Sequence, residues 1–188
     1  CTLFPYTTLF RSLMQYLAFY QAIEYFLPIC SQREAARRVR HVIRQPNFKT
    51  DRDADIQRVI GVVRALGGRG GGNELSQLKA TLDECIDESE LRDFLNAADR
   101  RDVFIKSKDI QAKKLNLDSP RVNILDEVAE RIYEIRCRIV HSKGADIDPD
   151  EQPLLPFTKE ERNLRRDLEL VQFVSARVIA ANGGDLSF

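Results

Sequence analysis

An arginine and a histidine stand close together in RCRIVHS, at the end of a long segment with helical apolar spacing. His141 is one of only two histidines in the chain, and imidazole is the side chain whose charge changes near neutral pH. Arg136, five positions earlier, stays charged, but five residues turn a regular helix by about 140°, so the two side chains would not share a face. They can meet if the helix tightens near Val140 or if a partner chain supplies half of a site. A histidine in the last turn of a helix also commonly stabilises the helix dipole, so the spacing alone leaves its role open.

A basic run, REAARRVRHVIR, lies much earlier in the chain. Residues 31–50 contain six Arg or Lys and one Glu, a local excess of five positive charges. At helical spacing, one face of this run holds Arg33, Arg37, Arg40 and Arg44. Such a stripe can bind the phosphate backbone of a nucleic acid, and it is also common on solvated helix faces. Both interpretations stay open.

No metal or cofactor site is expected. The cysteines, Cys1, Cys30, Cys85 and Cys137, are far apart and form no CxxC pair, so neither a zinc site nor a disulfide framework is predicted. Reduced thiols, as in a cytoplasmic protein, are the expected state. The acidic run at 146–151 lacks the glycine and the final glutamate that a calcium loop needs. The long helix carries regularly spaced glutamates, Glu127, Glu130 and Glu134, a pattern typical of a solvent-exposed helix face.

The elements that would position these side chains are all helical. Apolar spacing predicts a helix from Leu13 that ends or kinks at Pro28, and a second helix capped by Ser31 with Glu34. A third long segment is expected to start with the cap Ser119, place Pro120 in its first turn and stop at Gly144. Its buried stripe would comprise Val122, Leu125, Val128, Ile132, Ile135 and Ile139. Further helices are predicted over 54–66, 73–86, 88–115 with a break near 107–109, and from the box Thr158–Glu161 to Gly183.

Composition places the chain among ordinary globular proteins. It has 188 residues, 43% hydrophobic and 31% charged, which suits one domain with a real core. Lys plus Arg and Asp plus Glu both number 29, so any polyanion site must be local. The most apolar stretch, residues 13–30, is interrupted by Gln15, Gln21 and Glu24, and no membrane span is predicted.

The opening residues TLFPYTTLFRS, positions 2–12, resemble a translated sequencing adapter over their whole length. We therefore expect residues 1–12 to be a non-native leader. The native polypeptide would join near Leu13, and residues 13–188 would be one helical domain, the C-terminal part of a longer protein.

The chain from Leu13 to Ile179 resembles the HEPN superfamily. Its hallmark is an Arg followed, after four to six residues, by a His, and Arg136 and His141 match it at the end of a helix late in the chain. The segments LAFYQAIEYFLP, YEIRCRIVHSKG and PLLPFTKEERNLRRDLELVQFVSARVI look like bacterial, defence-associated HEPN proteins. One position departs from the pattern, because Cys137 stands where active members often have a polar residue.

This resemblance implies an all-α, antiparallel helical bundle with additional N-terminal helices, and a metal-independent endoribonuclease. The RNA 2′-hydroxyl would attack the adjacent phosphate, with His141 moving protons and Arg136 offsetting the developing charge. One Arg and one His are too few for both acid and base, so a two-fold homodimer is expected to bring two copies together. Glu24, Cys137 and Arg138 are candidate supporting residues. RNA, a second copy of the chain, and an upstream domain or an antitoxin-like regulator are the expected partners.

Two other interpretations remain. The chain could be a non-catalytic HEPN module that binds RNA or a protein and dimerises, which Cys137 and the zero net charge favour. It could also be a helical bundle without a site, in which replacing Arg136 or His141 would change stability alone.

Overall fold

The computed structural model describes residues 6–66, 74–97, 99–106, 110–140, 153–156 and 158–185. Within these ranges the chain is helical and contains no strand, so the all-α prediction is confirmed. The helices are α1 (Tyr6–Ile43), α2 (Asp53–Leu66), α3 (Glu74–Cys85), α4 (Glu88–Asn96), α5 (Arg101–Lys106), α6 (Ile124–Val140), α7 (Lys159–Arg162) and α8 (Arg165–Asn182), followed by the 3-10 turn Gly183–Asp185. None of them is long and apolar enough to cross a bilayer.

Helix α1, with 38 residues, is the longest helix of the described residues, and it is continuous through Pro28. The predicted end or kink at Pro28 is therefore wrong, as is the predicted cap at Ser31, which lies inside the helix. Pro28 is on the exposed side, whereas Leu27 and Cys30 on either side of it are buried. Because the buried face of α1 continues across the proline, packing outweighs the lost hydrogen bond.

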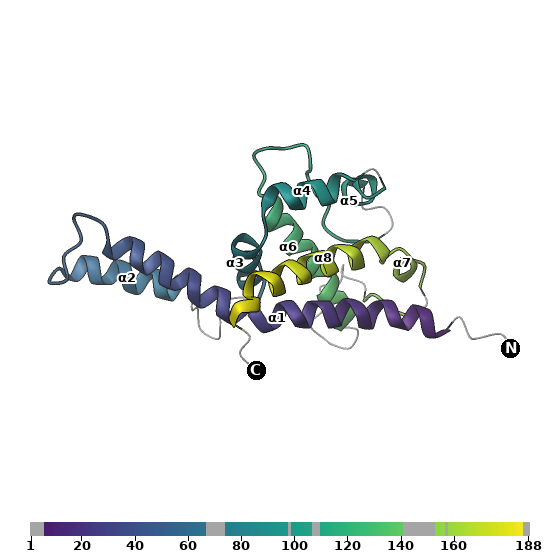
Figure 1. The fold of residues 1–188 in the computed structure, drawn as a ribbon, viewed down its shortest axis with the longest axis horizontal. Helices are drawn as coiled ribbons and strands as arrows, with labels where there is room; N and C mark the ends of the chain where they lie inside the picture. The colour runs from purple at the N-terminus through teal and green to yellow at the C-terminus, as the bar shows by residue number, and fades with distance from the viewer. Residues whose placement is uncertain are drawn as a thin grey trace.

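The first part of α1 supports a compact body (Figure 1). Helices α3, α6 and α8 pack against it, and α3 also packs against both α6 and α8. One buried cluster fills the space between them, and it includes Tyr16, Tyr20 and Ile23 of α1 together with Leu78 and Leu82 of α3. Helix α1 also includes residues 6–12, and their origin as a leader stays a prediction.

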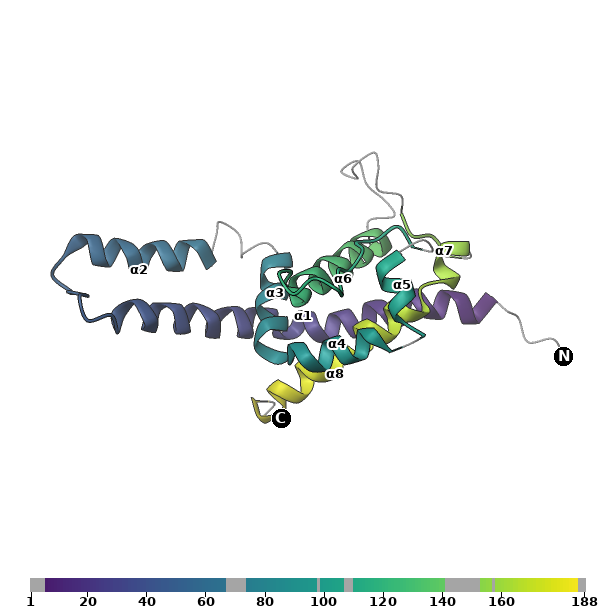
Figure 2. The same cartoon turned by 90° about the horizontal axis from the view of Figure 1, so that it is seen from above.

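The second part of α1 leaves the body and pairs with α2, so that the two helices project as an arm (Figures 1 and 2). Helix α2 matches the prediction for residues 54–66. At the tip, Asp55 is 1% exposed. Its carboxylate accepts hydrogen bonds from the Arg52 side chain at 2.8 and 3.0 Å and from the Lys49 amide at 3.0 Å, which closes the turn between the helices.

Helix α6 confirms most of the predicted buried stripe. Five of the six positions are buried, namely Leu125, Val128, Ile132, Ile135 and Ile139, whereas Val122 is partly exposed. The predicted start at Ser119 and Pro120 is wrong, because the helix begins at Ile124 and Asn123 caps it. The Asn123 side chain accepts from the amide of Leu125 at 3.0 Å, which satisfies one of the free N–H groups of the first turn. Gly144, the predicted stop, lies outside the described residues.

Two other predicted helices are divided in the structure. The segment 88–115 breaks between α4 and α5, before the expected position near 107–109, and residues 110–116 are not helical. Asp87 caps α4 by accepting from the amides of Ser89 and Glu90. Thr158 caps α7 as predicted, but a turn at residues 163–164 separates α7 from α8.

Candidate functional site

Arg136 lies where α1, α3 and α6 meet. Its Nη2 atom is 3.3 Å from Oε1 of Glu74, the first residue of α3, and 3.8 Å from Oε1 of Glu24 on α1. The Arg136 side chain is 18% exposed, so it is neither sealed in the core nor free in solvent. Glu24 was a candidate orienting residue, and the structure brings it within ion-pair distance of Arg136.

An aromatic ring completes this group. The Arg136 guanidinium carbon lies 5.4 Å from the centre of the Tyr20 ring, within the range of a cation–π contact. The Tyr20 hydroxyl donates a hydrogen bond of 2.7 Å to Glu74. Burial, with this bond to Glu74, raises the pKa of Tyr20, so the phenol stays a neutral donor at physiological pH. We call Tyr20, Glu24, Glu74 and Arg136 the Arg136 cluster.

The electrostatics of the cluster keep Arg136 charged. Burial on its own would lower the pKa of Arg136, but Glu74, Tyr20 and Cys137 together outweigh it, and the pKa lies above its ordinary value. The two carboxylates fix the guanidinium and also neutralise much of its charge. A phosphate that approaches Arg136 would therefore compete with Glu74 and Glu24.

The structure describes RCRIVHS only as far as Val140. Helix α6 extends through Val140, and His141 lies outside the described residues. Cys137 is partly buried, and burial together with the nearby Cys137 thiol raises the pKa of Tyr133. Leu154, past the segment that contains His141, donates a backbone hydrogen bond of 3.0 Å to the carbonyl of Arg138, so the chain returns to the end of α6.

Arg138, a candidate for substrate binding, is engaged inside the protein instead. Its side chain is 3% exposed and holds Glu160 through two hydrogen bonds of 2.8 and 2.9 Å. It also donates to the carbonyl of Gln111 at 2.6 Å. Two residues turn a helix by about 200°, so Arg138 faces away from Arg136. The expectation that Arg138 supports a site at Arg136 is therefore wrong.

The basic face of α1 divides into two parts. On the arm, a depression of about 410 Å³ is lined by Arg37, Arg40, His41 and Arg44. Arg37 pairs with Glu34, whereas no carboxylate of the described residues lies within ion-pair distance of Arg40, His41 or Arg44. Arg33, at the base of the arm, contacts Glu84 and Asn182. We call Arg40 and Arg44 the arm cations; His41 lines the same depression, and sequence reasoning did not include it in the basic face.

The glutamates of α6 contact other parts of the chain, so the prediction that they lie on a solvent-exposed face is wrong. Glu127 is 7% exposed and accepts hydrogen bonds of 2.7 Å from both the amide and the side chain of Asn116. Glu134 accepts from the amide of Lys113 at 2.8 Å, and Glu130 pairs with Lys79 and Lys113. Together these three carboxylates hold the non-helical segment 110–116 against α6.

Sequence reasoning also missed a buried ion pair. Arg131 and Asp167 are each 1% exposed, and two hydrogen bonds of 2.6 and 3.0 Å join them. Arg131 further donates to the carbonyl of Lys113 at 2.6 Å and lies over the Phe104 ring. The sequence offered one signal, because position 131 lies between the buried positions 128 and 135 of the same stripe.

The described residues and the comparisons with known proteins give no further lead to a function. No group of three or more His, Cys, Asp or Glu side chains among those residues is arranged to hold a metal ion. Comparison of the chain with family models, curated proteins and solved structures found no match.

Proposed function

We propose that the chain is a HEPN-like domain that binds RNA and cleaves it as a homodimer. Arg136 and His141 of both protomers would form the reacting set, in a helical bundle built on α1, α3, α6 and α8. The resemblance of the sequence to the HEPN superfamily is the source of this proposal.

One observation carries it: a partly exposed arginine is held in a fixed position just before the histidine of the motif. Arg136 is 18% exposed and is positioned by Glu74, Glu24 and the Tyr20 ring. Pre-positioned guanidinium groups stabilise charge that develops on a phosphate, because they need little reorganisation during the reaction. A histidine that follows on the same chain can transfer the protons.

The reaction would follow the chemistry of the RNA 2′-hydroxyl. One imidazole takes the proton of that hydroxyl while its oxygen bonds to the adjacent phosphorus. The bond from phosphorus to the 5′-oxygen breaks, and an imidazolium gives that oxygen a proton. The products are a 2′,3′-cyclic phosphate and a free 5′-hydroxyl. Two histidines are needed in one turnover, which is why the proposal includes a dimer.

The test is RNA cleavage by the full chain in EDTA, with single-stranded and structured RNA. Arg136→Ala is expected to lower the rate by about 10²–10³ and His141→Ala by about 10²–10⁴. RNA with a 2′-deoxy sugar at the cleaved position should stay intact. Arg165→Ala, an exposed arginine elsewhere, is the matched control and should cleave normally.

The dimer is tested in the same preparation. Sedimentation gives the dimer dissociation constant, and specific activity should fall as the chain is diluted below it. Activity that does not depend on dilution would contradict a shared site. Cleavage that survives both the Arg136 and the His141 replacements would overturn the enzyme proposal.

A second candidate function, a non-catalytic RNA-binding module, is favoured by two observations. Arg136 already faces two carboxylates, and the arm cations have no carboxylate partner among the described residues. Under this alternative RNA stays uncleaved in every condition, while binding depends on Arg40 and Arg44. A role in a defence or stress response, with a regulator as partner, is implied only by the resemblance to HEPN proteins. It is compatible with both candidate functions.

A further inference from the structure

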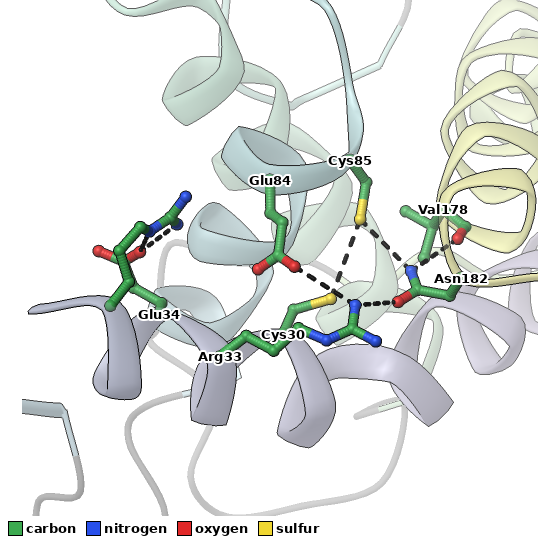
Figure 3. A network of polar contacts seen from close by, with 8 residues as sticks. Cys30, Arg33, Glu34, Glu84, Cys85, Val178 and Asn182 are labelled. Atoms are coloured by element: carbon green, nitrogen blue, oxygen red, sulfur yellow. Dashed lines mark hydrogen bonds and ion pairs between the residues drawn. The ribbon is translucent and has the colours of Figure 1, made fainter. Parts of the chain in front are cut away.

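Two cysteines that are far apart in the sequence meet at the base of the arm. Cys30 lies on α1 and Cys85 is the last residue of α3, and their Sγ atoms are 3.9 Å apart (Figure 3). Both thiols are free, and nothing in the sequence indicated that they lie side by side. A disulfide has an S–S bond of about 2.05 Å, so the two sulfurs need to approach by about 2 Å to bond.

A polar cluster surrounds the two sulfurs and joins three helices. Arg33 donates to Oδ1 of Asn182 at 2.7 Å and contacts Glu84 at 3.4 Å. Nδ2 of Asn182 donates to Sγ of Cys85 at 3.4 Å and to the carbonyl of Val178 at 2.8 Å. Arg33, Glu84 and Asn182 therefore fix an interior turn of α1 to the C-terminal ends of α3 and α8 around the cysteine pair (Figure 3).

The two sulfurs differ in access and share a proton. Cys30 is fully buried, whereas Cys85 is partly exposed. The hydrogen bond with Cys85 lowers the pKa of Cys30 to about 7, and the positive charge of Arg33 adds to this effect. The same bond, with burial, raises the pKa of Cys85, so near neutral pH the thiolate of the pair is Cys30 and the proton is on Cys85.

We propose that Cys30 and Cys85 are a redox-active pair that forms a reversible intramolecular disulfide when the chain meets a small peroxide. This proposal stands on the juxtaposition of the two sulfurs and does not depend on the proposed nuclease activity.

The step balances with hydrogen peroxide as the oxidant. The accessible Cys85 sulfur attacks one peroxide oxygen while the neighbouring Cys30 thiolate takes its proton; the O–O bond breaks, and the hydroxide that leaves takes a proton from solvent to become water. Cys30 then attacks the sulfur of the Cys85 sulfenic acid. The S–O bond breaks, the Cys30 proton leaves with the hydroxyl as a second water, and the disulfide forms. Two thiols are oxidised, one peroxide is reduced, and a dithiol reductant reverses the reaction by exchange.

The position of the pair gives the disulfide a structural consequence. The chain between the two cysteines includes the end of α1 and all of α2, which make up the arm. A bond between α1 and α3 would therefore close the arm into a covalent loop at its base. The arm cations lie inside that loop, so oxidation would fix the surface that carries them.

The experiment uses the full chain carrying Cys1→Ser, reduced and then treated with a stoichiometric amount of hydrogen peroxide at pH 7. Intact mass and peptide mapping by mass spectrometry are the readouts. We expect the loss of two hydrogens, one cross-linked peptide that contains both Cys30 and Cys85, and full recovery of both thiols with dithiothreitol. Circular dichroism confirms that the oxidised chain stays folded.

Cys137→Ser is the matched control, since Cys137 is also a partly buried thiol, and it should leave the cross-link unchanged. Cys85→Ala should abolish the cross-link and leave Cys30 reduced. Two results would overturn the proposal: oxidation of the folded chain that stops at Cys85 sulfinic acid, or a cross-link that forms only in urea.

Discussion

Glu74 holds two partners of the Arg136 cluster at once, because its Oε1 atom lies 3.3 Å from Arg136 Nη2 and accepts the Tyr20 hydroxyl at 2.7 Å. Glu74 is also the first residue of α3, where the helix dipole favours a negative charge. The position of Arg136 is thus tied to the start of α3 as well as to α6. A carboxylate in this place both orients the guanidinium and opposes the binding of a phosphate.

Glu74→Gln tests which of these two effects dominates. The amide oxygen can still accept from Tyr20, but the charge is gone, so we expect RNA to bind up to about fivefold more tightly, in line with the value of a partly exposed ion pair. Fluorescence anisotropy with labelled RNA at fixed salt measures the change. Glu24→Gln should have a smaller effect, because Glu24 is farther from Arg136 and more exposed. Weaker binding by Glu74→Gln would mean that orientation by Glu74 matters more than its charge.

The arm cations give a second prediction, based on salt dependence. Arg40→Ala with Arg44→Ala removes two charges that face no carboxylate among the described residues. Binding to single-stranded RNA should weaken, and the slope of log K against log salt should become shallower by about 1.4, since each phosphate contact contributes about 0.7. Anisotropy titrations at several salt concentrations give the slope.

The control removes the same charge elsewhere. Arg162→Ala with Arg165→Ala replaces two exposed arginines beside α8. If this double variant loses as much affinity and as much slope as the arm variant, binding depends on overall charge, and the arm has no special role.

The buried stripe of α6 could be predicted because it follows from a local pattern. Apolar residues at helical spacing face whatever the helix packs against. The burial of Val128, Ile132 and Ile135 could therefore be predicted without knowing which helices contact α6. The continuity of α1 through Pro28 could not be predicted, because it depends on α3 and α8 packing across the proline. Local propensity predicts a break there, and only tertiary contacts reverse it.

The polar contacts were the least predictable part. The cysteines of the redox pair are 55 positions apart, and their meeting depends on the register of α1 against α3. The glutamates of α6 have the spacing of a solvated face, yet Glu127 and Glu134 accept hydrogen bonds from backbone amides of the segment 110–116, which has no periodic pattern. In the Arg136 cluster, Glu24 could be guessed from its position on α1, but nothing in the sequence indicated Glu74.

Asp55 gives a prediction for acid solution. Its hydrogen bonds from Arg52, followed by that from the Lys49 amide, lower the pKa of Asp55 to about 2 from an ordinary value of 3.8. Because the folded-state pKa is depressed, the stabilisation is present above pH 4 and is lost as the pH falls towards 2. An NMR titration of the Asp55 carboxyl should give a midpoint near 2, and the amides of α2 should exchange faster with solvent over the same range.

Asp53→Asn is the control for Asp55→Asn, since Asp53 lies in the same turn of α2 but is exposed. Only Asp55→Asn should speed amide exchange in α2 at pH 6. Equal effects of the two variants, or an Asp55 midpoint near 4, would show that the hydrogen bonds at the tip of the arm contribute little.

The buried pair of Arg131 and Asp167 gives the largest predicted change in stability. Asp167→Asn leaves a guanidinium in the core without its countercharge, which is expected to lower the free energy of unfolding by about 3–5 kcal/mol in urea denaturation. Arg131→Met leaves the buried Asp167 carboxylate without its countercharge and also removes the hydrogen bond to the Lys113 carbonyl. The free energy of unfolding should therefore fall by a similar amount. The double variant Arg131→Met with Asp167→Leu removes both charges and should be more stable than either single variant, because no buried charge is left. If the double variant instead loses the sum of the two single changes, the residues act independently, and the core depends on their separate contacts rather than on the pair.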